Sequence, residues 1–248
     1  MRLIASDYDG TFTNNGGVDD ARRQAVADWQ AAGNKFGIVS GRSIDFLPST
    51  LERDGVRCDF FIANNGAVIT DGSGNLLIER RCDGKIALPL IRTLFGLSCP
   101  HASVTTDHPC TVYPALSEAR PGRFTVNTEK IAYFNQISTV LPTFEKAARV
   151  TAIIREQFGE WVNPLQNGIC IDIVPASVDK ASGIRSLLSL WQMTEADVIA
   201  VGDNVNDAAM IGAFYSYAVE NAVDSIKALA DREAKTVTDL IRTELAQA

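Results

Sequence analysis

The chain has 248 residues, of which 46% are hydrophobic, and it carries a formal net charge of -7. This length and composition are typical of an enzyme-sized folded protein and exclude a chain that is disordered throughout. The acidic balance argues against a broad nucleic-acid-binding surface, so no nucleic-acid partner is predicted. Any phosphate that the protein binds must therefore be held by local groups.

The N-terminal residues and the cysteines indicate a cellular compartment. The start, MRLIASDYDG, reaches an acidic residue after too few apolar positions for a secretory signal, and no apolar run approaches membrane-spanning length. Five cysteines are scattered along the chain without a CxxC pair, a pattern most simply explained by reduced thiols. We expect a cytoplasmic protein with no membrane partner.

Buried strands separated by single helices open the chain. Apolar runs predict strands at residues 3–6, 36–39 and 60–63, and the stretches 19–32 and 44–51 have helical composition. This alternation predicts βαβ units and a parallel sheet.

The end of the chain repeats the same pattern. A helix is predicted at 180–191, a buried strand at 198–201 and a further helix at 208–214. We therefore assign both ends of the chain to one α/β domain.

The middle of the chain has a different organisation. Two predicted helices, 85–95 and 143–158, lie among extended segments, which is typical of a separate α+β domain. The predicted fold is a three-layer α/β/α Rossmann-like core with a parallel sheet, formed by residues 1–81 and 176–248, with an inserted α+β domain of residues 82–175.

The first polar segment, Asp7-Tyr8-Asp9-Gly10-Thr11, directly follows the first predicted strand. Two carboxylates two residues apart at a strand end can converge on one point, where one attacks and the other moves protons. An acidic turn that ends in glycine is the structural alternative.

Two further segments are individually weaker signals. Ser40, Gly41 and Arg42 follow the second strand, where a hydroxyl and free backbone N–H groups can hold a phosphate, although Ser-Gly is also an ordinary turn. Lys180 begins a predicted helix, and a lysine at such a position is usually a solvated charge.

The fourth segment, Gly202-Asp203-Asn204-Val205-Asn206-Asp207, follows the strand at 198–201. Its carboxylate and amide oxygens suit a hard cation such as Mg²⁺. All four segments lie at predicted carboxyl ends of strands or in the turns after them, the edge at which open α/β sheets bind ligands.

In this order, the four segments resemble the motifs of the haloacid dehalogenase superfamily of phosphohydrolases, which read DxDGT, Ser or Thr followed by Gly-Arg, Lys, and GDxxND. The insertion between the second and third motifs, together with Asn64-Asn65-Gly66-Ala67 after the third strand, is similar to the Cof-type (class IIB) branch, in which the insertion is a cap. Phe12 departs from the leucine that is common after DGT, but it is not a catalytic position.

The resemblance implies a role for each matching residue. Asp7 is the nucleophile that forms an aspartyl-phosphate, and Asp9 is the general acid and base. Asp7, the backbone carbonyl of Asp9, and Asp203 bind Mg²⁺, while Lys180 offsets negative charge. Such help is needed, because a carboxylate that approaches a dianionic phosphate to 4 Å meets a repulsion of about 8 kcal/mol at an effective dielectric constant of about 20.

The resemblance also implies a phosphate site and a substrate class. The phosphate ligands are Thr11, Ser40, Gly41, Lys180 and Asn206, and Asp207 lies behind the metal ligands or braces Lys180. The expected activity is Mg²⁺-dependent hydrolysis of a small phosphomonoester, with sugar phosphates as the leading class. A phosphomutase, a disaccharide-phosphate phosphatase and a non-catalytic sensor of a phosphorylated ligand are the alternatives.

Two cysteines and both histidines of the chain, at Cys99, His101, His108 and Cys110, lie close together in the inserted domain. They offer the ligand types of a zinc site, but their spacing does not match the usual pattern of structural zinc sites. We expect the cysteines to be buried packing residues instead. The leaving group and the oligomeric state are left open by the sequence.

Overall fold

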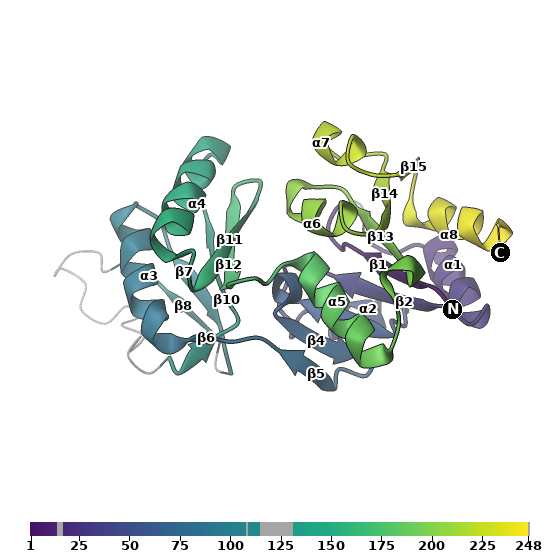
Figure 1. The fold of residues 1–248 in the computed structure, drawn as a ribbon, viewed down its shortest axis with the longest axis horizontal. Coiled ribbons are helices and arrows are strands. Elements are labelled where there is room, and N and C mark those ends of the chain that lie inside the picture. The colour runs from purple at the N-terminus through teal and green to yellow at the C-terminus, as the bar shows by residue number, and fades with distance from the viewer. Residues whose placement is uncertain (14–16, 108, 115–130, 248) are drawn as a thin grey trace. The chain divides into compact units, whose positions relative to one another are not determined.

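The structure is a computed structural model that describes residues 1–13, 17–107, 109–114 and 131–247. It consists of two compact units (Figure 1). The first unit comprises Met1–Ile78 and Asp179–Ala248, and the second comprises Glu79–Val178. The boundaries predicted from the sequence lie a few residues from these.

An eight-stranded sheet forms the centre of the first unit, in the order β15-β14-β13-β1-β2-β3-β4-β5. Neighbouring strands from β15 to β3 are parallel, and β4 is antiparallel to β3. The predicted α/β fold with a mainly parallel sheet is therefore confirmed. The strands are β1 (Leu3–Ser6), β2 (Lys35–Val39), β3 (Phe60–Ala63), β4 (Val68–Asp71), β5 (Leu76–Glu79), β13 (Val198–Gly202), β14 (Tyr215–Val219) and β15 (Arg232–Ala234).

Strand β1 lies between β2 and β13 in the middle of this sheet. All of its residues are buried, as expected for a central parallel strand covered on both faces. Ser6 pairs with Ile38 on one side and with Val201 on the other. The loops after β1, β2 and β13 therefore leave the sheet at the same edge, where the predicted polar segments begin.

Helices cover both faces of this sheet (Figure 1). Helix α1 packs against α8, and α5 packs against α6, β3 and β4. The Asp19 side chain caps α1 by accepting the Arg22 N–H. The helices are α1 (Asp20–Ala31), α2 (Leu47–Arg53), α5 (Lys180–Trp191), α6 (Ala208–Ile211), α7 (Asp224–Lys227) and α8 (Val237–Ala246), with short 3₁₀ turns η1 (Asn64–Gly66), η3 (Glu195–Asp197) and η4 (Val205–Asp207).

The second unit has a five-stranded sheet in the order β11-β12-β10-β7-β8 and a two-stranded sheet of β6 and β9. The pairs in both sheets are antiparallel, and the apolar side chains of the larger sheet share one core with α3 and α4. The elements are β6 (Cys82–Asp83), α3 (Gly84–Gly96), β7 (Ala102–Thr105), β8 (Cys110–Val112), β9 (Tyr133–Phe134), β10 (Gln136–Val140), α4 (Phe144–Phe158), β11 (Val162–Asn167) and β12 (Cys170–Pro175).

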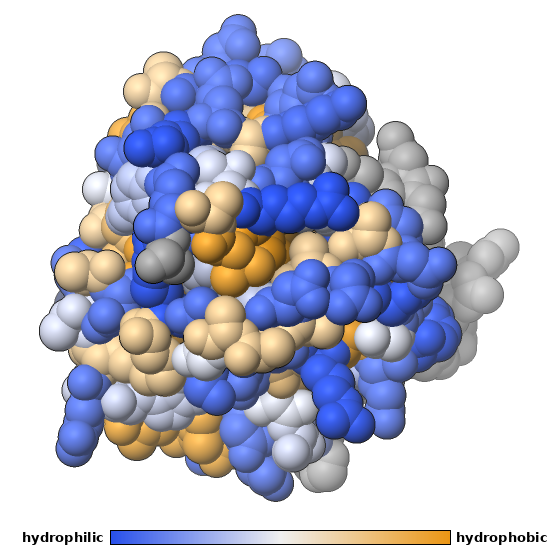
Figure 2. All heavy atoms as spheres, turned by 90° about the vertical axis from the view of Figure 1, so that its right-hand side faces the viewer, coloured by the Kyte–Doolittle hydropathy of each residue, from blue (hydrophilic) through white to orange (hydrophobic). Residues whose placement is uncertain are grey.

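Figure 2 shows the side of the molecule on which Figure 1 places α1 and α8. Hydrophilic residues cover most of this face, and a small group of hydrophobic residues is visible near its centre. Among the described residues, no helix combines the length and the apolar character that crossing a membrane requires.

Candidate active site

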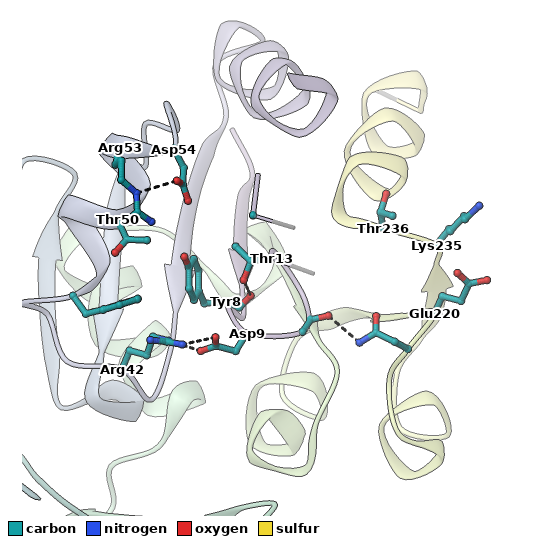
Figure 3. Close-up of a pocket in the computed structure, with 14 residues that line it drawn as sticks. Tyr8, Asp9, Thr13, Arg42, Thr50, Arg53, Asp54, Glu220, Lys235 and Thr236 are labelled. Carbon is teal, nitrogen blue, oxygen red and sulfur yellow. Dashed lines mark hydrogen bonds and ion pairs between the residues drawn. The ribbon is translucent and has the colours of Figure 1, made fainter. Parts of the chain in front are cut away.

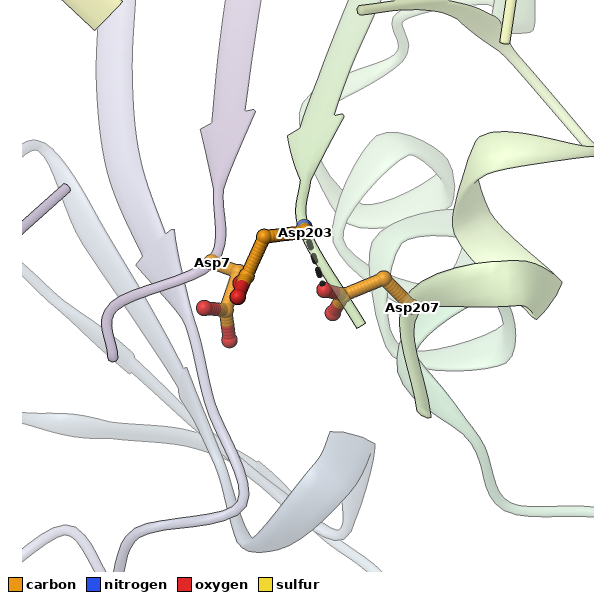
Figure 4. Close-up of side chains that lie close together, drawn as sticks. All are labelled: Asp7, Asp203 and Asp207. Atoms are coloured by element: carbon orange, nitrogen blue, oxygen red, sulfur yellow. Dashed lines mark hydrogen bonds between the residues drawn. The ribbon is translucent and has the colours of Figure 1, made fainter. Parts of the chain in front are cut away.

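Three aspartates meet at the carboxyl edge of the first unit's sheet (Figure 4). Asp7 follows β1, Asp203 follows β13, and Asp207 ends η4, and one carboxylate oxygen from each lies within 4.8 Å of the others. The Asp7 N–H donates to the Val201 carbonyl at 2.9 Å, which extends the pairing of the two strands into this site. The parallel register thus brings the first and fourth predicted segments together.

Lys180 lies between two of these aspartates. Its ammonium group is 2.5 Å from Oδ1 of Asp7 and 2.5 Å from Oδ1 of Asp207, and its side chain is fully buried. Lys180 is the first residue of α5, and the capping side chain of Asp179 accepts the Ser182 N–H. The lysine identified in the sequence is therefore a buried, doubly paired cation and not a solvated charge.

Two glycines allow the start of α5 to approach the turn after β3. Gly66 has a φ of +109°, and a Cβ atom there would lie 2.2 Å from the Asp179 carbonyl oxygen. A Cβ atom on Gly183 would lie 2.8 Å from the Cα of Gly66. In the sequence, Gly66 stands out only as part of the family pattern, and the one local signal for Gly183 is its place in the first turn of a helix, where glycine is unfavourable.

Asp207 is completely buried, and both of its carboxylate oxygens are engaged. Oδ1 accepts from Lys180, while Oδ2 accepts the N–H groups of Asp203 and Asn204 at 3.0 and 3.1 Å (Figure 4). These contacts fix the turn that carries Asp203. They are consistent with the predicted bracing of Lys180, which stays a prediction as a functional role.

Asp203 is oriented by the segment that follows β1. The Thr11 hydroxyl donates to Oδ1 of Asp203 at 2.7 Å. Gly10 has a φ of +86°, and a Cβ atom there would lie 2.4 Å from Oδ2 of Asp203. The Asn221 side chain donates to the Gly10 carbonyl at 2.9 Å. The Thr11 hydroxyl thus contacts a carboxylate, and its predicted contact with phosphate stays a prediction.

Burial sets the protonation behaviour of this cluster. Removal from water raises the pKa of Asp7 well above its usual value, against the attraction of Lys180, and burial also raises the pKa of Asp203. Burial alone would lower the pKa of Lys180, but Asp207 and Asp7 outweigh it and raise this pKa. Lys180 is therefore charged. Its single positive charge does not fully offset the cost of burying the ionised carboxylates of Asp7 and Asp203.

The donor set fits a divalent cation. Carboxylate oxygens are the ligands that hard cations such as Mg²⁺ prefer, and an added positive charge would favour the ionised forms of Asp7 and Asp203. Asp207 has both oxygens occupied, so Asp7 and Asp203 are the better candidates within the cluster. Ligation by the backbone carbonyl of Asp9 stays a prediction.

The Asp9 side chain pairs with Arg42 (Figure 3). The Arg42 guanidinium donates from Nε and Nη2 to the two carboxylate oxygens of Asp9 at 2.6 and 2.8 Å. Both residues line a cavity of about 1040 Å³, which also contacts Tyr8, Phe46 and Arg53. In the sequence, Arg42 is only the last residue of the Ser-Gly-Arg motif, and nothing there pairs it with Asp9.

The remaining predicted phosphate ligands lie at the ends of β2 and β13. Ser40 is buried, and its Oγ accepts the Arg42 N–H at 3.1 Å. Asn206 lies in η4, and its buried Oδ1 has no hydrogen-bond partner among the residues that the structure describes. Ser40, Gly41 and Asn206 stay predictions as phosphate ligands.

Among the described candidate zinc ligands of the second unit, Cys99, His101 and Cys110 do not form a cluster of metal-binding side chains. Cys99 is buried, Cys110 is partly buried, and the His101 ring lies 6.3 Å from the Tyr113 ring. His108 lies outside the described residues. In the parts of the chain that the structure describes, only Asp7, Asp203 and Asp207 form a cluster of metal-binding side chains.

Comparisons with known proteins extend over nearly the whole chain. Residues 4–239 match a family model described as haloacid dehalogenase-like hydrolase. The chain is 25% identical to 5-amino-6-(5-phospho-D-ribitylamino)uracil phosphatase YbjI of Escherichia coli, over 94% of this chain and 90% of that protein. It is 26% identical to phosphoglycolate phosphatase of Methanothermobacter thermautotrophicus, over 93% of this chain and 90% of that protein.

The fold also matches solved structures. One is the HAD subclass IIB sugar phosphatase BT4131, with a TM-score of 0.80, 17% identity, and coverage of 100% of this chain and 99% of that chain. Another is a haloacid dehalogenase-like hydrolase from B. subtilis, with a TM-score of 0.82, 21% identity, and coverage of 98% and 99%. At these identities the similarity concerns the fold.

Proposed function

The chain belongs to the haloacid dehalogenase-like hydrolases, and on that basis we propose that it is a Mg²⁺-dependent phosphatase of small phosphomonoesters, with sugar phosphates as its leading substrate class. Its resemblance to this family, predicted from four motifs, is confirmed by the family match. Relatives named as phosphatases for a phosphoribityl compound and for phosphoglycolate support phosphomonoester hydrolysis as the reaction. The similar fold of a subclass IIB sugar phosphatase supports the choice of sugar phosphates.

The position of Lys180 carries the proposal. A buried ammonium group lies 2.5 Å from one oxygen of Asp7, at the edge of the sheet where open α/β folds bind ligands. A nucleophilic carboxylate must approach a phosphate that carries negative charge, so positive charge beside it is required for attack. Lys180 supplies one such charge without any movement of the chain.

The proposed reaction has two steps. In the first, an Asp7 oxygen forms a bond to phosphorus, the bond from phosphorus to the leaving oxygen breaks, and Asp9 gives its proton to that oxygen. In the second, a water oxygen bonds to phosphorus and its proton passes to Asp9, while the bond between phosphorus and Asp7 breaks and inorganic phosphate leaves.

The other residues hold the ion and the phosphate. Asp7, Asp203 and the backbone carbonyl of Asp9 would hold Mg²⁺, which would supply positive charge to offset the charge on the phosphoryl oxygens in the transition state. The phosphoryl oxygens contact a set of polar groups that comprises Thr11, Ser40, Gly41, Lys180 and Asn206.

Two further assignments belong to this proposal. We give the second unit the role of a cap that selects the leaving group, which agrees with its having a separate hydrophobic core. The five cysteines are all free, which supports the predicted location in the cytoplasm.

The test is release of phosphate from 4-nitrophenyl phosphate with Mg²⁺ and after treatment with EDTA. A panel follows, comprising glucose 6-phosphate, ribose 5-phosphate, glycerol 3-phosphate and phosphoglycolate. We expect Mg²⁺-dependent release that is lost in Asp7→Asn and retained in Asp28→Asn, a matched change on the exposed face of α1. Binding of these compounds without release from any of them would contradict hydrolysis and favour the mutase or sensor alternatives.

A further inference from the structure

One arginine engages both side-chain oxygens of Asp9. Arg42 Nε is 2.6 Å from Oδ2, and Arg42 Nη2 is 2.8 Å from Oδ1. This is the planar fork by which guanidinium groups hold carboxylates, and it fixes the plane of the carboxylate as well as its position.

Arg42 is itself held by four further contacts. Its guanidinium carbon lies 4.1 Å from the centre of the Phe46 ring and 5.6 Å from that of the Tyr8 ring. Its backbone N–H donates to Ser40 Oγ at 3.1 Å, and its carbonyl accepts the Asn64 N–H at 2.9 Å. The fork is therefore attached to the ends of β2 and β3, so it can impose a direction on Asp9.

We infer that Arg42 is a positioning residue that aims the Asp9 carboxyl group at the leaving oxygen of the substrate. This inference rests on the proposed function, because it depends on Asp9 acting as the general acid. A carboxylate offers about four lone-pair sites, and the fork takes one on each oxygen. The proton can therefore be held and released at another site while the fork sets its direction.

A purely structural ion pair is the competing explanation. The side chains of Arg42 and Asp9 are 40% and 53% exposed, and pairs that are exposed to this degree contribute about 0–1 kcal/mol to stability. Such a pair would not make the effect of a mutation depend on the leaving group. A positioning role does, because only a poor leaving group needs a proton from Asp9 as its bond to phosphorus breaks.

The experiment compares kcat/KM for two substrates in Arg42→Gln. Because kcat/KM covers the steps up to release of the leaving group, it excludes the later hydrolysis of the phosphorylated enzyme. For the best alkyl phosphate of the panel we expect a loss of about 10- to 100-fold, the usual size for misplacement of a proton donor. For 4-nitrophenyl phosphate, whose leaving group departs as a stable anion, kcat/KM should change less than about 3-fold.

Arg42→Lys distinguishes the two-point contact of the guanidinium group from its positive charge. Lysine keeps the positive charge but cannot hold both carboxylate oxygens in one plane, so we expect it to recover little of the activity on the alkyl phosphate. Phe46→Leu, which removes the ring under the guanidinium, should give a smaller loss with the same dependence on the leaving group. Full recovery in Arg42→Lys would overturn the inference that the fork sets the direction.

A double-mutant cycle tests whether the loss of kcat/KM in Arg42→Gln arises through Asp9. Because Arg42 acts through Asp9, Asp9→Asn combined with Arg42→Gln should be no slower on the alkyl phosphate than Asp9→Asn alone. Arg53→Gln is the matched control, since it removes a cation from the wall of the same cavity without contacting Asp9. Additive losses, or equal losses on both substrates, would contradict the positioning role.

The two proposals fail in different ways. If Asp9→Asn lowers kcat/KM equally for both substrates, the general-acid role in the proposed function is wrong. If Asp9→Asn affects only the alkyl phosphate while Arg42→Gln raises KM for both substrates, Asp9 is the acid and Arg42 binds phosphate directly, so only the inference about Arg42 is overturned.

Discussion

The hydroxyl of Thr11 donates to the carboxylate of Asp203 at 2.7 Å, across 192 positions of the sequence. This bond joins the segment after β1 to the segment after β13. It orients Asp203, which we propose as a metal ligand, and groups that orient metal ligands typically contribute 10- to 100-fold to affinity.

Thr11→Val should therefore raise the Mg²⁺ concentration for half-maximal activity by about 10-fold or more. Titration of phosphate release with Mg²⁺ measures this directly. The control is Thr13→Val, because the Thr13 hydroxyl donates to the Tyr8 carbonyl and does not contact Asp203. An unchanged Mg²⁺ dependence in Thr11→Val would show that Asp203 does not depend on this bond.

Lys180→Met should lower both activity and stability. It removes the only charge partner recorded for two buried carboxylates, Asp7 and Asp207, within the described residues, and loss of one partner of a buried pair costs about 3–5 kcal/mol. Urea unfolding measures this cost. In comparison, Lys35→Met breaks a partly exposed pair with Asp59 and should cost clearly less, about 1 kcal/mol. Equal costs would argue against the importance of burial at Lys180.

Asp7→Asn should abolish turnover and yet stabilise the metal-free protein. Burial raises the pKa of Asp7, so the folded state favours its neutral form. The stabilising contribution of that form is complete below the pKa of the unfolded chain, near 3.8, and is lost as the pH rises towards the folded-state value. At neutral pH an uncharged asparagine avoids this cost.

Melting temperatures in EDTA test this expectation. Asp7→Asn should melt about 2 °C or more above the wild type at pH 7.5, where each 1 kcal/mol corresponds to about 2–4 °C for a chain of this size. The difference should shrink towards pH 4.5, and saturating Mg²⁺ should stabilise the wild type more than the variant. A variant that melts below the wild type in EDTA would mean that losing the ion pair with Lys180 costs more than is gained by no longer burying a charged carboxylate.

Helices and strands could be predicted where the sequence shows a clear periodic or continuous apolar pattern. The predicted helix at 180–191 coincides with α5, whereas the helix predicted at 44–51 begins later, at Leu47, next to Pro48. Strand β15 has only three residues, Arg232–Ala234, two of them charged, and it offers no apolar run to detect. Its place in the sheet is decided by pairing with β14.

The residue types of the site were predictable, but most of their contacts were not. Asp7, Asp203 and Lys180 lie at strand ends and at a helix start, so their convergence follows from the parallel topology. The bonds of Thr11 to Asp203 and of Arg42 to Asp9 depend on how separate loops approach each other, and local patterns do not specify that approach. The close contact between Gly66 and Gly183 is of the same kind.

Gly183→Ala tests that contact. Its Cβ atom would lie 2.8 Å from the Cα of Gly66 and 2.8 Å from the Ile62 side chain, so α5 must shift to accept it. Because α5 carries Lys180, we expect a stability loss of about 1–3 kcal/mol and a clear fall in kcat. Gly96→Ala is the control, since a Cβ there would meet no atom of the described residues within 4 Å outside its own stretch of helix. Wild-type kcat in Gly183→Ala would show that Lys180 tolerates displacement of its helix.

A buried network around Glu244 gives a prediction on stability alone. Oε2 of Glu244 is 2.5 Å from Arg2 Nη1, and its Oε1 accepts the Tyr217 hydroxyl at 2.5 Å, which ties α8 to the residue before β1 and to β14. Burial would raise the pKa of Glu244, but hydrogen bonds from Tyr217 and Arg2 outweigh it and lower this pKa. The network therefore stabilises the fold above the unfolded-state pKa, near 4.5, and its contribution is lost as the pH falls through the folded-state value.

Glu244→Gln should accordingly lower the free energy of unfolding by about 1–3 kcal/mol at pH 7 and by much less near pH 3.5. The folded variant should keep the wild-type kcat, because Arg2 precedes β1 whereas Asp7 follows it, so the network lies at the opposite end of the strand from the nucleophile. Glu195→Gln, which breaks an exposed pair with Arg185, is the control and should cost no more than about 1 kcal/mol at either pH. A loss in Glu244→Gln that is equally large at both pH values would mean that the effect comes from packing and not from the charge of Glu244.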